Sequence, residues 1–268
     1  MTTRIAVCGA AGRMGRAILE VCSRTKGVGV TVAIEHSAST KLGMDSGDVA
    51  GIGKNGVVII SNIKSVIKDF DVLIDFTQPL ATIENVKHCR QAGKRVVIGT
   101  TGLDDKQKKI IRAASKNIGI VFSPNMSVGV NLCFKLVELA AKIIGEDTDI
   151  EIIEAHHRMK KDAPSGTAVH LGEIIADTLG RDLKKCAVYG RKGVSGVRDN
   201  KTIGFETIRA GDIVGDHTVL FASSGERVEI THKATSRDAF ATGAVLAARW
   251  LMKMDKGLYD MQDVLGLR

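Results

Sequence analysis

Short apolar runs alternate with helical patterns along the first half of the chain, and this alternation limits the fold more than any other feature. Several of the runs are apolar throughout, as expected for strands whose two faces are both covered. The expected strands are Arg4–Cys8, Val28–Ile34, Val57–Ile60, Asp71–Phe76, Arg95–Ile98 and Gly119–Phe122, with helices near Arg13–Arg24, Leu80–Ala92 and Asp104–Asn117. This order predicts an α/β fold built on a doubly wound parallel sheet with right-handed crossovers.

The pattern changes after about Asn125, which predicts a second domain of α+β type. A long helix is expected first, then a strand, a helix and a series of antiparallel strands with turns at 210–212 and 224–226. The bounds are Val128–Ile144, Asp149–Ala155, Ser165–Leu179 and the stretch from Ile203 to Ala234. The glycine-rich and basic segment 184–201 predicts a loop.

A last helix is expected from Ser236, a good N-cap, to about Lys256, with Gly257 ending it. This helix could return to either domain, and we favour the first. We therefore expect one domain formed by residues 1–127 with 237–268, and another formed by residues 128–236.

The chain of 268 residues carries a formal net charge of +8, which suits nucleic acid, a membrane surface or small anions. Only 4% of the residues are aromatic, whereas proteins that bind single strands stack bases on aromatic side chains. The basic residues on the helix after Asp104 fit a solvated face. The longest charge-free run, Asn117–Phe134, contains several polar residues and does not fit a membrane span. We therefore expect neither a nucleic-acid nor a membrane partner.

The five cysteines lie far apart and form no C-x-x-C pair. This usage is typical of free thiols in a reducing compartment, so we expect a cytoplasmic protein without disulfides. The first residues also lack the apolar stretch of a signal peptide.

The first expected strand leads into a glycine loop with the sequence GAAGRMG at residues 9–15. A dinucleotide pyrophosphate needs backbone N–H groups at a helix N-terminus, with no Cβ in the way. Gly9 can make the turn, Gly12 can admit the phosphates, and Gly15 can let the helix pack closely on the strand. A tight turn that binds nothing is the alternative, but the strand, loop and helix stand in the order that a dinucleotide site needs.

The second expected strand ends at Glu35, 20 residues after Gly15. An acidic residue at this place is expected to bond the adenosine ribose hydroxyls, which favours NAD. His36 follows directly, and an imidazole cannot form the bidentate fork that arginine makes with a 2′-phosphate. Arg13 or Lys41 could serve that phosphate instead.

The strongest chemical signal is the stretch EAHHRMKKDAPSGTA at residues 154–168, at the end of an expected strand. The helix that follows it offers free N–H groups and its dipole to an anion, and the hydroxyls of Ser165 and Thr167 add donors. His156 or His157 can donate a proton near neutral pH. A solvated strand-to-helix connection is the alternative. A metal site is disfavoured, because adjacent histidines on a strand point to opposite sides and no cysteine completes a set of ligands.

These segments resemble the 4-hydroxy-tetrahydrodipicolinate reductases, also called dihydrodipicolinate reductases, of lysine and diaminopimelate biosynthesis. The similar motifs span nearly the whole chain, and the stretch at 154–168 is the most specific. They are GAAGRMG at 9–15, DFTQP at 75–79, GTTG at 99–102, SPNMSVGVN at 123–131, EAHHRMKKDAPSGTA at 154–168 and IGFETIRAGDIVGDHTV at 203–219. The resemblance implies a Rossmann domain that the C-terminal helix rejoins, and a central domain whose sheet supports a homotetramer.

The resemblance also implies roles for particular residues. His156 takes the position of the proton donor and Lys160 that of a second catalytic group. The implied cofactor-binding residues are Gly9, Ala10, Ala11, Gly12, Arg13, Met14, Glu35, His36, Gly99, Thr100, Thr101, Ser123, Pro124, Asn125 and Met126. The implied substrate-binding residues are Thr101, His157, Lys160, Ser165, Gly166 and Thr167.

The reaction implied by the resemblance is the reduction of a cyclic imine dicarboxylate by NADH or NADPH with loss of water. His36 stands where many members have arginine, which favours NADH or the use of both cofactors. Met159 stands where many members have another histidine, so that position is not expected to transfer protons. Two other functions are weighed: an NAD(H)-sensing regulator, and another dehydrogenase of aspartate-derived metabolism. A semialdehyde dehydrogenase of that kind would need a nucleophilic cysteine, whereas Cys133 lies inside an apolar helical pattern that is typical of a core position.

Overall fold

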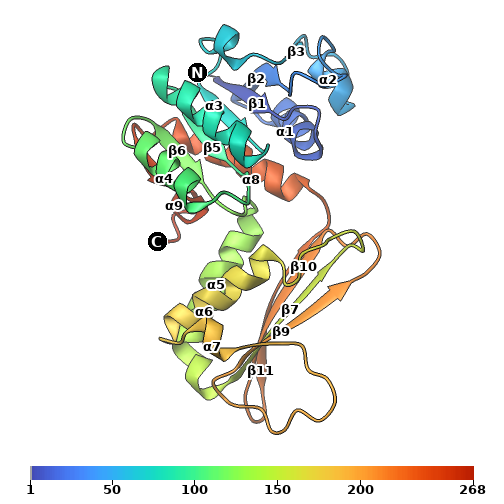
Figure 1. Ribbon diagram of the computed structural model, residues 1–268, viewed down its shortest axis with the longest axis vertical. Helices are drawn as coiled ribbons and strands as arrows, with labels where there is room; N and C mark the ends of the chain where they lie inside the picture. The colour runs from blue at the N-terminus through green and yellow to red at the C-terminus, as the bar shows by residue number, and fades with distance from the viewer. Residues whose placement is uncertain (1) are drawn as a thin grey trace. The chain divides into compact units, whose positions relative to one another are not determined.

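The computed structural model describes residues 2–268, which divide into two units (Figure 1). One unit contains the residues up to Val128 together with Arg237–Arg268, and the other contains Gly129–Ser236. The chain thus leaves the first unit once and returns to it for its last segment. In the described residues no helix is both long enough and apolar enough to cross a membrane.

The first unit is built on a parallel sheet of seven strands in the order β12-β6-β5-β4-β1-β2-β3. Its strands are β1 (Thr3–Cys8), β2 (Val28–Ile34), β3 (Ile59–Ile60), β4 (Val72–Asp75), β5 (Arg95–Ile98), β6 (Gly119–Phe122) and β12 (Gly257–Tyr259). The order runs outward in both directions from β1 and β4, as in a doubly wound fold. The predicted fold class is confirmed, and the carboxyl ends of β1, β4 and β5 meet at one edge of the sheet.

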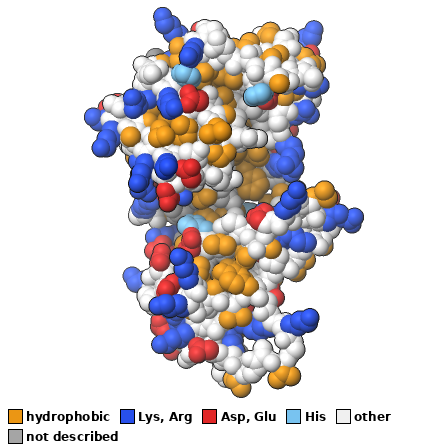
Figure 2. Space-filling model, in the orientation of Figure 1, with side chains coloured by type: hydrophobic (Ala, Val, Ile, Leu, Met, Phe, Trp, Pro, Cys, Tyr) orange, Lys and Arg blue, Asp and Glu red, His pale blue; other side chains and the backbone are white. Residues whose placement is uncertain are grey.

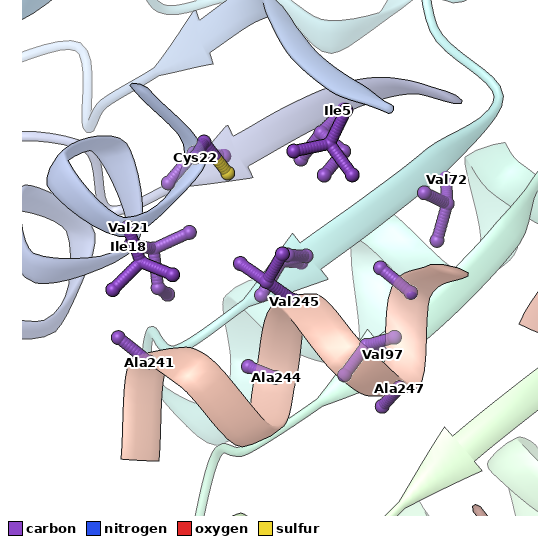
Figure 3. Packing of buried hydrophobic residues seen from close by; sticks show 14 of the residues in the cluster. Ile5, Ile18, Val21, Cys22, Val72, Val97, Ala241, Ala244, Val245 and Ala247 are labelled. Carbon is purple, nitrogen blue, oxygen red and sulfur yellow. The ribbon is translucent and has the colours of Figure 1, made fainter. Parts of the chain in front are cut away.

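Helices cover both faces of this sheet, because successive residues of a strand point to opposite sides. Ile5 and Val7 pack with the residues of α1 and α8, whereas Ala6 and Cys8 pack with those of α3 and α4. Figure 3 shows α8 lying along the sheet beside α1, with small and β-branched side chains between them. The helices are α1 (Arg13–Arg24), α2 (Ser46–Ala50), α3 (Pro79–Gln91), α4 (Asp105–Ala114), α8 (Asp238–Leu251) and α9 (Met261–Leu265), with a 3-10 turn at Ile63–Val66.

The end of the chain differs from the sequence prediction. Helix α8 follows Arg237 rather than Ser236 and ends at Leu251, not near Lys256. The guanidinium of Arg95 donates to the carbonyl of Met254 at 2.9 and 3.0 Å, which holds the chain beside the sheet edge. Residues Gly257–Tyr259 then pair with β6 as an additional strand.

The second unit is built on a five-stranded sheet in the order β11-β10-β7-β9-β8. Its strands are β7 (Asp149–His156), β8 (Ala187–Tyr189), β9 (Ile203–Arg209), β10 (Gly215–Ala222) and β11 (Arg227–Ala234). Strands β10 and β11 form the expected hairpin. The expected pairing of β9 with β10 is wrong, because β7 lies between them, parallel to β9 and antiparallel to β10.

One face of this sheet packs on helices, and its core contains Val137, Ile152, Leu171, Phe205 and Phe221. The helices are α5 (Val128–Ile144), α6 (Gly166–Thr178) and α7 (Leu183–Cys186), with a 3-10 turn at Gly145–Asp147. Helix α7 and strand β8 occupy the start of the segment that the sequence predicted to be a loop. Arg191 and Arg198, in the rest of that segment, both donate to Glu151 of β7.

The surface charges do not form a stripe of one sign on the face drawn in Figure 2. Lysine and arginine side chains are spread among acidic ones over each unit. On this face the basic side chains are therefore not gathered into one patch.

Candidate active site

The glycine loop has the conformation that its spacing predicts. Gly9 takes a left-handed φ of +71° and its carbonyl accepts from the N–H of Gly12 at 2.9 Å. A Cβ on Gly15 would lie 2.1 Å from the carbonyl oxygen of Gly9, so only glycine lets α1 pack this closely on the loop. Gly12 is the N-cap of α1 and provides no side chain to cap it. The first turn of α1 therefore offers its N–H groups and its dipole to an anion.

Glu35 lies next to this loop, although the two are far apart in the sequence. Its carboxylate accepts from the N–H of Ala11 and from its neighbour His36, both at 2.9 Å. The ring of His36 is exposed and its Nδ1 accepts from the N–H of Ala38 at 3.2 Å. The structure therefore brings together the predicted residues 9–15, Glu35 and His36, as a site for a pyrophosphate and its adjoining ribose requires.

A buried carboxylate with no role predicted from the sequence holds the next loops together. Asp75, at the end of β4, is fully buried and accepts from the N–H and the hydroxyl of Thr77 at 3.0 and 2.6 Å. The amide of Asn85 donates to its other oxygen at 2.9 Å, and the hydroxyl of Thr100 lies at 3.3 Å. Asp75 thus ties the loop after β4 to the loop after β5, which contains the predicted residues Gly99, Thr100 and Thr101.

The loop after β6 is held by its own polar groups. The hydroxyl of Ser123 donates to the carbonyl of Asn125 at 2.8 Å, and the Asn125 side chain accepts from the N–H of Ser127 at 2.9 Å. The side chain of Met126 is only 1% exposed and packs in the core, so this residue can meet a cofactor only through its backbone. A Cβ on Gly243 of α8 would lie 1.7 Å from the Met126 carbonyl oxygen, which shows how closely α8 supports this loop.

The second unit places His156 at the end of β7, where its Nδ1 lies 2.6 Å from a carboxylate oxygen of Glu154. Residues two apart on a strand share a face, which explains this contact. Glu154 is 1% exposed and receives a bidentate bond from Arg209 of β9, at 2.7 and 2.8 Å. His156 thus belongs to a group of one buried carboxylate, one partly buried guanidinium and one buried imidazole.

Burial and neighbouring charges set the proton affinities of this group. Burial acts to raise the pKa of Glu154, but the bonds from Arg209 and His156 outweigh it and the pKa of this carboxyl is lowered. Burial lowers the pKa of His156, while its bond to Glu154 acts in the opposite direction. Because Glu154 is ionised and accepts, Nδ1 of His156 carries a proton and Nε2 is the nitrogen that can exchange one with a bound molecule.

The predicted anion site lies in the same unit. Ser165 is the N-cap of α6, its hydroxyl accepts from the N–H of Ala168 at 3.2 Å, and Gly166 and Thr167 begin the helix. The ammonium of Lys160 lies 2.9 Å from the carboxylate of Asp162, and the N–H of Lys160 donates to the carbonyl of His157. The loop and the helix start therefore bring together the substrate-binding residues that were predicted in this unit.

Arg209 and His217 also contact this site, and no motif in the sequence predicted a role for either residue. His217 of β10 lies 2.8 Å from the Ser165 hydroxyl, and its ring meets that of His156 edge-on at 5.1 Å. Burial, and then the nearby His156, lower the pKa of His217 to about 4, so it is neutral near pH 7. The sequence did contain one signal for His217: side chains alternate between the two faces of this strand, and His217 stands at a position that faces inward.

Together, these features are those of a nicotinamide-dependent oxidoreductase, with a dinucleotide loop in one unit and, in the other, a helix N-terminus that follows a loop containing a histidine and a lysine. Residues 3–126 match the family model described as dihydrodipicolinate reductase, N-terminus, and residues 129–265 match dihydrodipicolinate reductase, C-terminus. The chain therefore belongs to the dihydrodipicolinate reductase family. Its first part is the NAD(P)-binding Rossmann domain of this family, which uses NADH or NADPH.

One curated relative is similar to this chain in sequence, and two solved structures are similar to it in fold. The chain is 56% identical over 266 residues to the 4-hydroxy-tetrahydrodipicolinate reductase of Hahella chejuensis, covering 99% of this chain and all of the relative. The fold is similar to that of a dipicolinate-bound dihydrodipicolinate reductase from Paenisporosarcina sp. TG-14, with a TM-score of 0.78, 24% identity and coverage of 98% and 99%. An amine dehydrogenase from Mycobacterium smegmatis shares the fold more distantly, with a TM-score of 0.62, 12% identity and coverage of 96% and 94%.

Proposed function

We propose that this protein reduces 4-hydroxy-tetrahydrodipicolinate to tetrahydrodipicolinate in the synthesis of lysine and diaminopimelate. The observation that carries this proposal is the 56% identity to a reductase of that name over nearly the full length of both chains. A hydride and a proton enter the substrate, and its 4-hydroxyl leaves as water. The substrate is a cyclic imine with two carboxylates, which suits a site made of a lysine and a helix N-terminus.

In this mechanism the nicotinamide, when bound, supplies the hydride. His156 donates a proton from Nε2, because its Nδ1 is held by Glu154 at 2.6 Å. Lys160 exchanges Asp162 for a substrate carboxylate. The N–H groups of Gly166 and Thr167 and the Thr167 hydroxyl bind a carboxylate at the start of α6, which Ser165 caps. His157, on the same loop as Lys160, adds a further substrate contact in this unit. The protein thus orients the substrate and provides the proton, and much of the rate gain comes from positioning.

For the cofactor we propose NADH, or NADH and NADPH together. Gly9–Met14 bind the pyrophosphate, Glu35 binds the adenosine ribose, and Gly99–Thr101 with Ser123–Met126 surround the nicotinamide. The carboxylate of Glu35 beside the loop supports ribose binding. The exposed imidazole of His36 cannot bind a 2′-phosphate with the two parallel N–H donors that an arginine provides.

We also propose a cytoplasmic homotetramer that assembles through the sheet of the second unit. On the face of this sheet away from α5 and α6, Ile153 and Ile208 are 37% and 48% exposed. Apolar side chains in the middle of an uncovered sheet face favour burial against another sheet. The cysteines of the described residues are free, which supports a reducing compartment.

The deciding experiment follows the absorbance of NADH and NADPH in parallel reactions with the fresh product of dihydrodipicolinate synthase. Oxidation of either cofactor that depends on this product is expected, with NADH at least as efficient. Oxidation without it, or none with either cofactor, would contradict the proposal. An NAD(H)-sensing regulator would bind NADH without turnover, and a semialdehyde dehydrogenase would need an active thiolate, whereas burial raises the pKa of Cys133.

The roles of His156 and Lys160 are tested by His156→Gln and Lys160→Ala. Each variant should lower kcat by roughly 100-fold or more, because general acid catalysis typically contributes that much. Circular dichroism checks that the variants are folded, and Lys161→Ala, whose side chain is exposed, is the matched control for the lysine. Near-normal turnover in both variants would remove these residues from the mechanism.

A further inference from the structure

One buried carboxylate joins every element of the second unit that carries a proposed substrate or proton-transfer residue. Glu154 of β7 contacts His156 on its own strand and Arg209 on β9. It also accepts from the N–H of Ser165, the N-cap of α6, at 3.1 Å, and from the hydroxyl of Thr207 at 3.3 Å. Because Glu154 is 1% exposed, water does not compete for these bonds.

Arg209 extends this connection to the loop that carries Lys160. The same guanidinium nitrogen that bonds Glu154 at 2.7 Å donates to the carbonyl of Asp162 at 2.6 Å. Asp162 is also the ion-pair partner of Lys160. The acid, the helix start and the lysine loop are thus all held within two bonds of one side chain.

On the proposed function, in which His156 donates the proton, we propose that Glu154 is a positioning residue. It holds the His156 imidazole so that Nδ1 points to the carboxylate and Nε2 is left for the substrate. Through its bonds to Ser165 and Arg209 it also fixes the position of the ring relative to the N-terminus of α6 and the Lys160 loop. A buried ion pair can be replaced by apolar groups with little loss of stability, so this arrangement is not explained by stability alone. The carboxylate does what an apolar side chain could not, because it selects one tautomer and supports the charged imidazolium.

Four charged or titratable groups face His156, and they come from every strand packed beside it. They are Glu154 on β7, Arg209 on β9, His217 on β10 and Lys160 on the following loop. Glu154 acts to raise the pKa of His156, and Lys160 and Arg209 act to lower it. His217 is neutral in the working range, because its own pKa is lowered to about 4. Removing the charge of Glu154 should therefore lower the pKa of His156, and removing the charge of Arg209 should raise it.

The test is the titration of His156 in Glu154→Gln, followed by NMR of its ring and by the pH profile of kcat/KM. The pKa of His156 should fall by about one unit or more, because a carboxylate in contact shifts an imidazole by that amount. Turnover needs the protonated ring, so the alkaline limb of kcat/KM should move to lower pH by the same amount. Glu206→Gln is the matched control, since it makes the same change on β9 at a half-exposed side chain, and it should leave both curves in place.

Arg209→Gln gives the opposite sign, since it removes a cation and leaves the carboxylate, and the pKa of His156 should rise. Arg209→Lys, which keeps the charge, should restore part of the original titration. If Glu154→Gln does not fold, Glu154→Asp shortens the side chain and breaks the 2.6 Å contact while keeping the charge, and a fall in the His156 pKa is again expected.

The proposal is overturned if the His156 titration is the same in wild type, Glu154→Gln and Glu154→Asp, or if it shifts the same way in Glu154→Gln and Arg209→Gln. Loss of activity with an unchanged pH profile is what a purely structural role would give, and it also overturns the proposal. The NMR titration does not depend on turnover. A normal rate in His156→Gln would therefore refute the proposed acid without affecting the test of Glu154.

Discussion

Two buried carboxylates, Asp75 and Glu154, sit at the ends of central strands and are stabilised in different ways. Glu154 is neutralised by Arg209, whereas Asp75 is held by hydroxyl, amide and backbone donors. Burying an ionised group costs several kcal/mol unless its lone pairs are satisfied, so each carboxylate depends on its donors and the donors depend on it. In both cases residues from separate loops are brought together at the edge of a sheet where a ligand would bind.

Asp75→Ala should destabilise the first unit by about 3 kcal/mol, since it leaves Thr77, Thr100 and Asn85 without their buried acceptor. Urea unfolding followed by fluorescence or circular dichroism measures the loss. The exposed Asp69→Ala is the matched control, for which we expect a change within about 0.5 kcal/mol. An equal effect in the two variants would contradict the role given to Asp75.

The helices and strands whose ends are set by local interactions were predicted correctly from the sequence. Helices α1 and α5 and strands β2, β5 and β6 have the expected bounds, because apolar periodicity and turn residues mark their ends. Strand β12 has only three residues, and its place depends on Arg95, whose guanidinium binds Met254 159 positions away. The position of β7 between β9 and β10 was also out of reach, since a strand pattern indicates which face is buried but not which strand is the neighbour.

In the candidate site, too, residues in short motifs could be predicted, whereas contacts between distant residues could not. The glycine loop, Glu35 and the stretch around His156 could be found because each is a short motif with a stated chemistry. Arg209 contacts Glu154 across 55 positions, and His217 contacts Ser165 across 52, so no spacing in the sequence indicates either contact. The partners that adjust His156 therefore become visible only in the folded sheet.

Helix α8 packs closely on the loop after β6 at Gly243. An added Cβ would lie 1.7 Å from the carbonyl oxygen of Met126, so Gly243→Ala must push the helix away from the loop after β6. We expect a net loss of about 1–3 kcal/mol, even though alanine is the better helix former. Thr242→Ala, at the exposed position just before Gly243 in α8, should change the stability by less than about 0.5 kcal/mol. A more stable Gly243→Ala protein in thermal unfolding would contradict this close contact.

The exposed face of the second unit's sheet is the surface through which the proposed tetramer assembles. Ile208→Glu places a charge at a 48% exposed position of β9, which is harmless in a monomer but costly if another sheet covers it. We expect the mass in light scattering to fall from that of a tetramer to that of a smaller species. Val58→Glu, at a 51% exposed position in the first unit, should leave the mass unchanged. A tetramer that persists in Ile208→Glu would show that this face is not the interface.

Stability against acid is the last whole-molecule property that the site determines. Burial, and then His156, lower the pKa of His217 from 6.5 to about 4. Between these pH values the unfolded chain binds a proton that the folded protein does not, so the stabilisation present above pH 6.5 is lost as the pH falls towards 4. The loss is about 1.4 kcal/mol per pH unit for one proton, or as much as about 3 kcal/mol over the window.

His217→Asn should therefore flatten the dependence of the unfolding free energy on pH between 6.5 and 4, as measured by urea unfolding at a series of pH values. Some slope will remain, because burial also lowers the pKa of His156 and of His232. His36→Asn, at a ring that lies in solvent, is the control and should keep the wild-type slope. If His217→Asn also keeps that slope, other groups cause the loss of stability in acid, and the lowered pKa of His217 does not contribute to the pH dependence of the unfolding free energy.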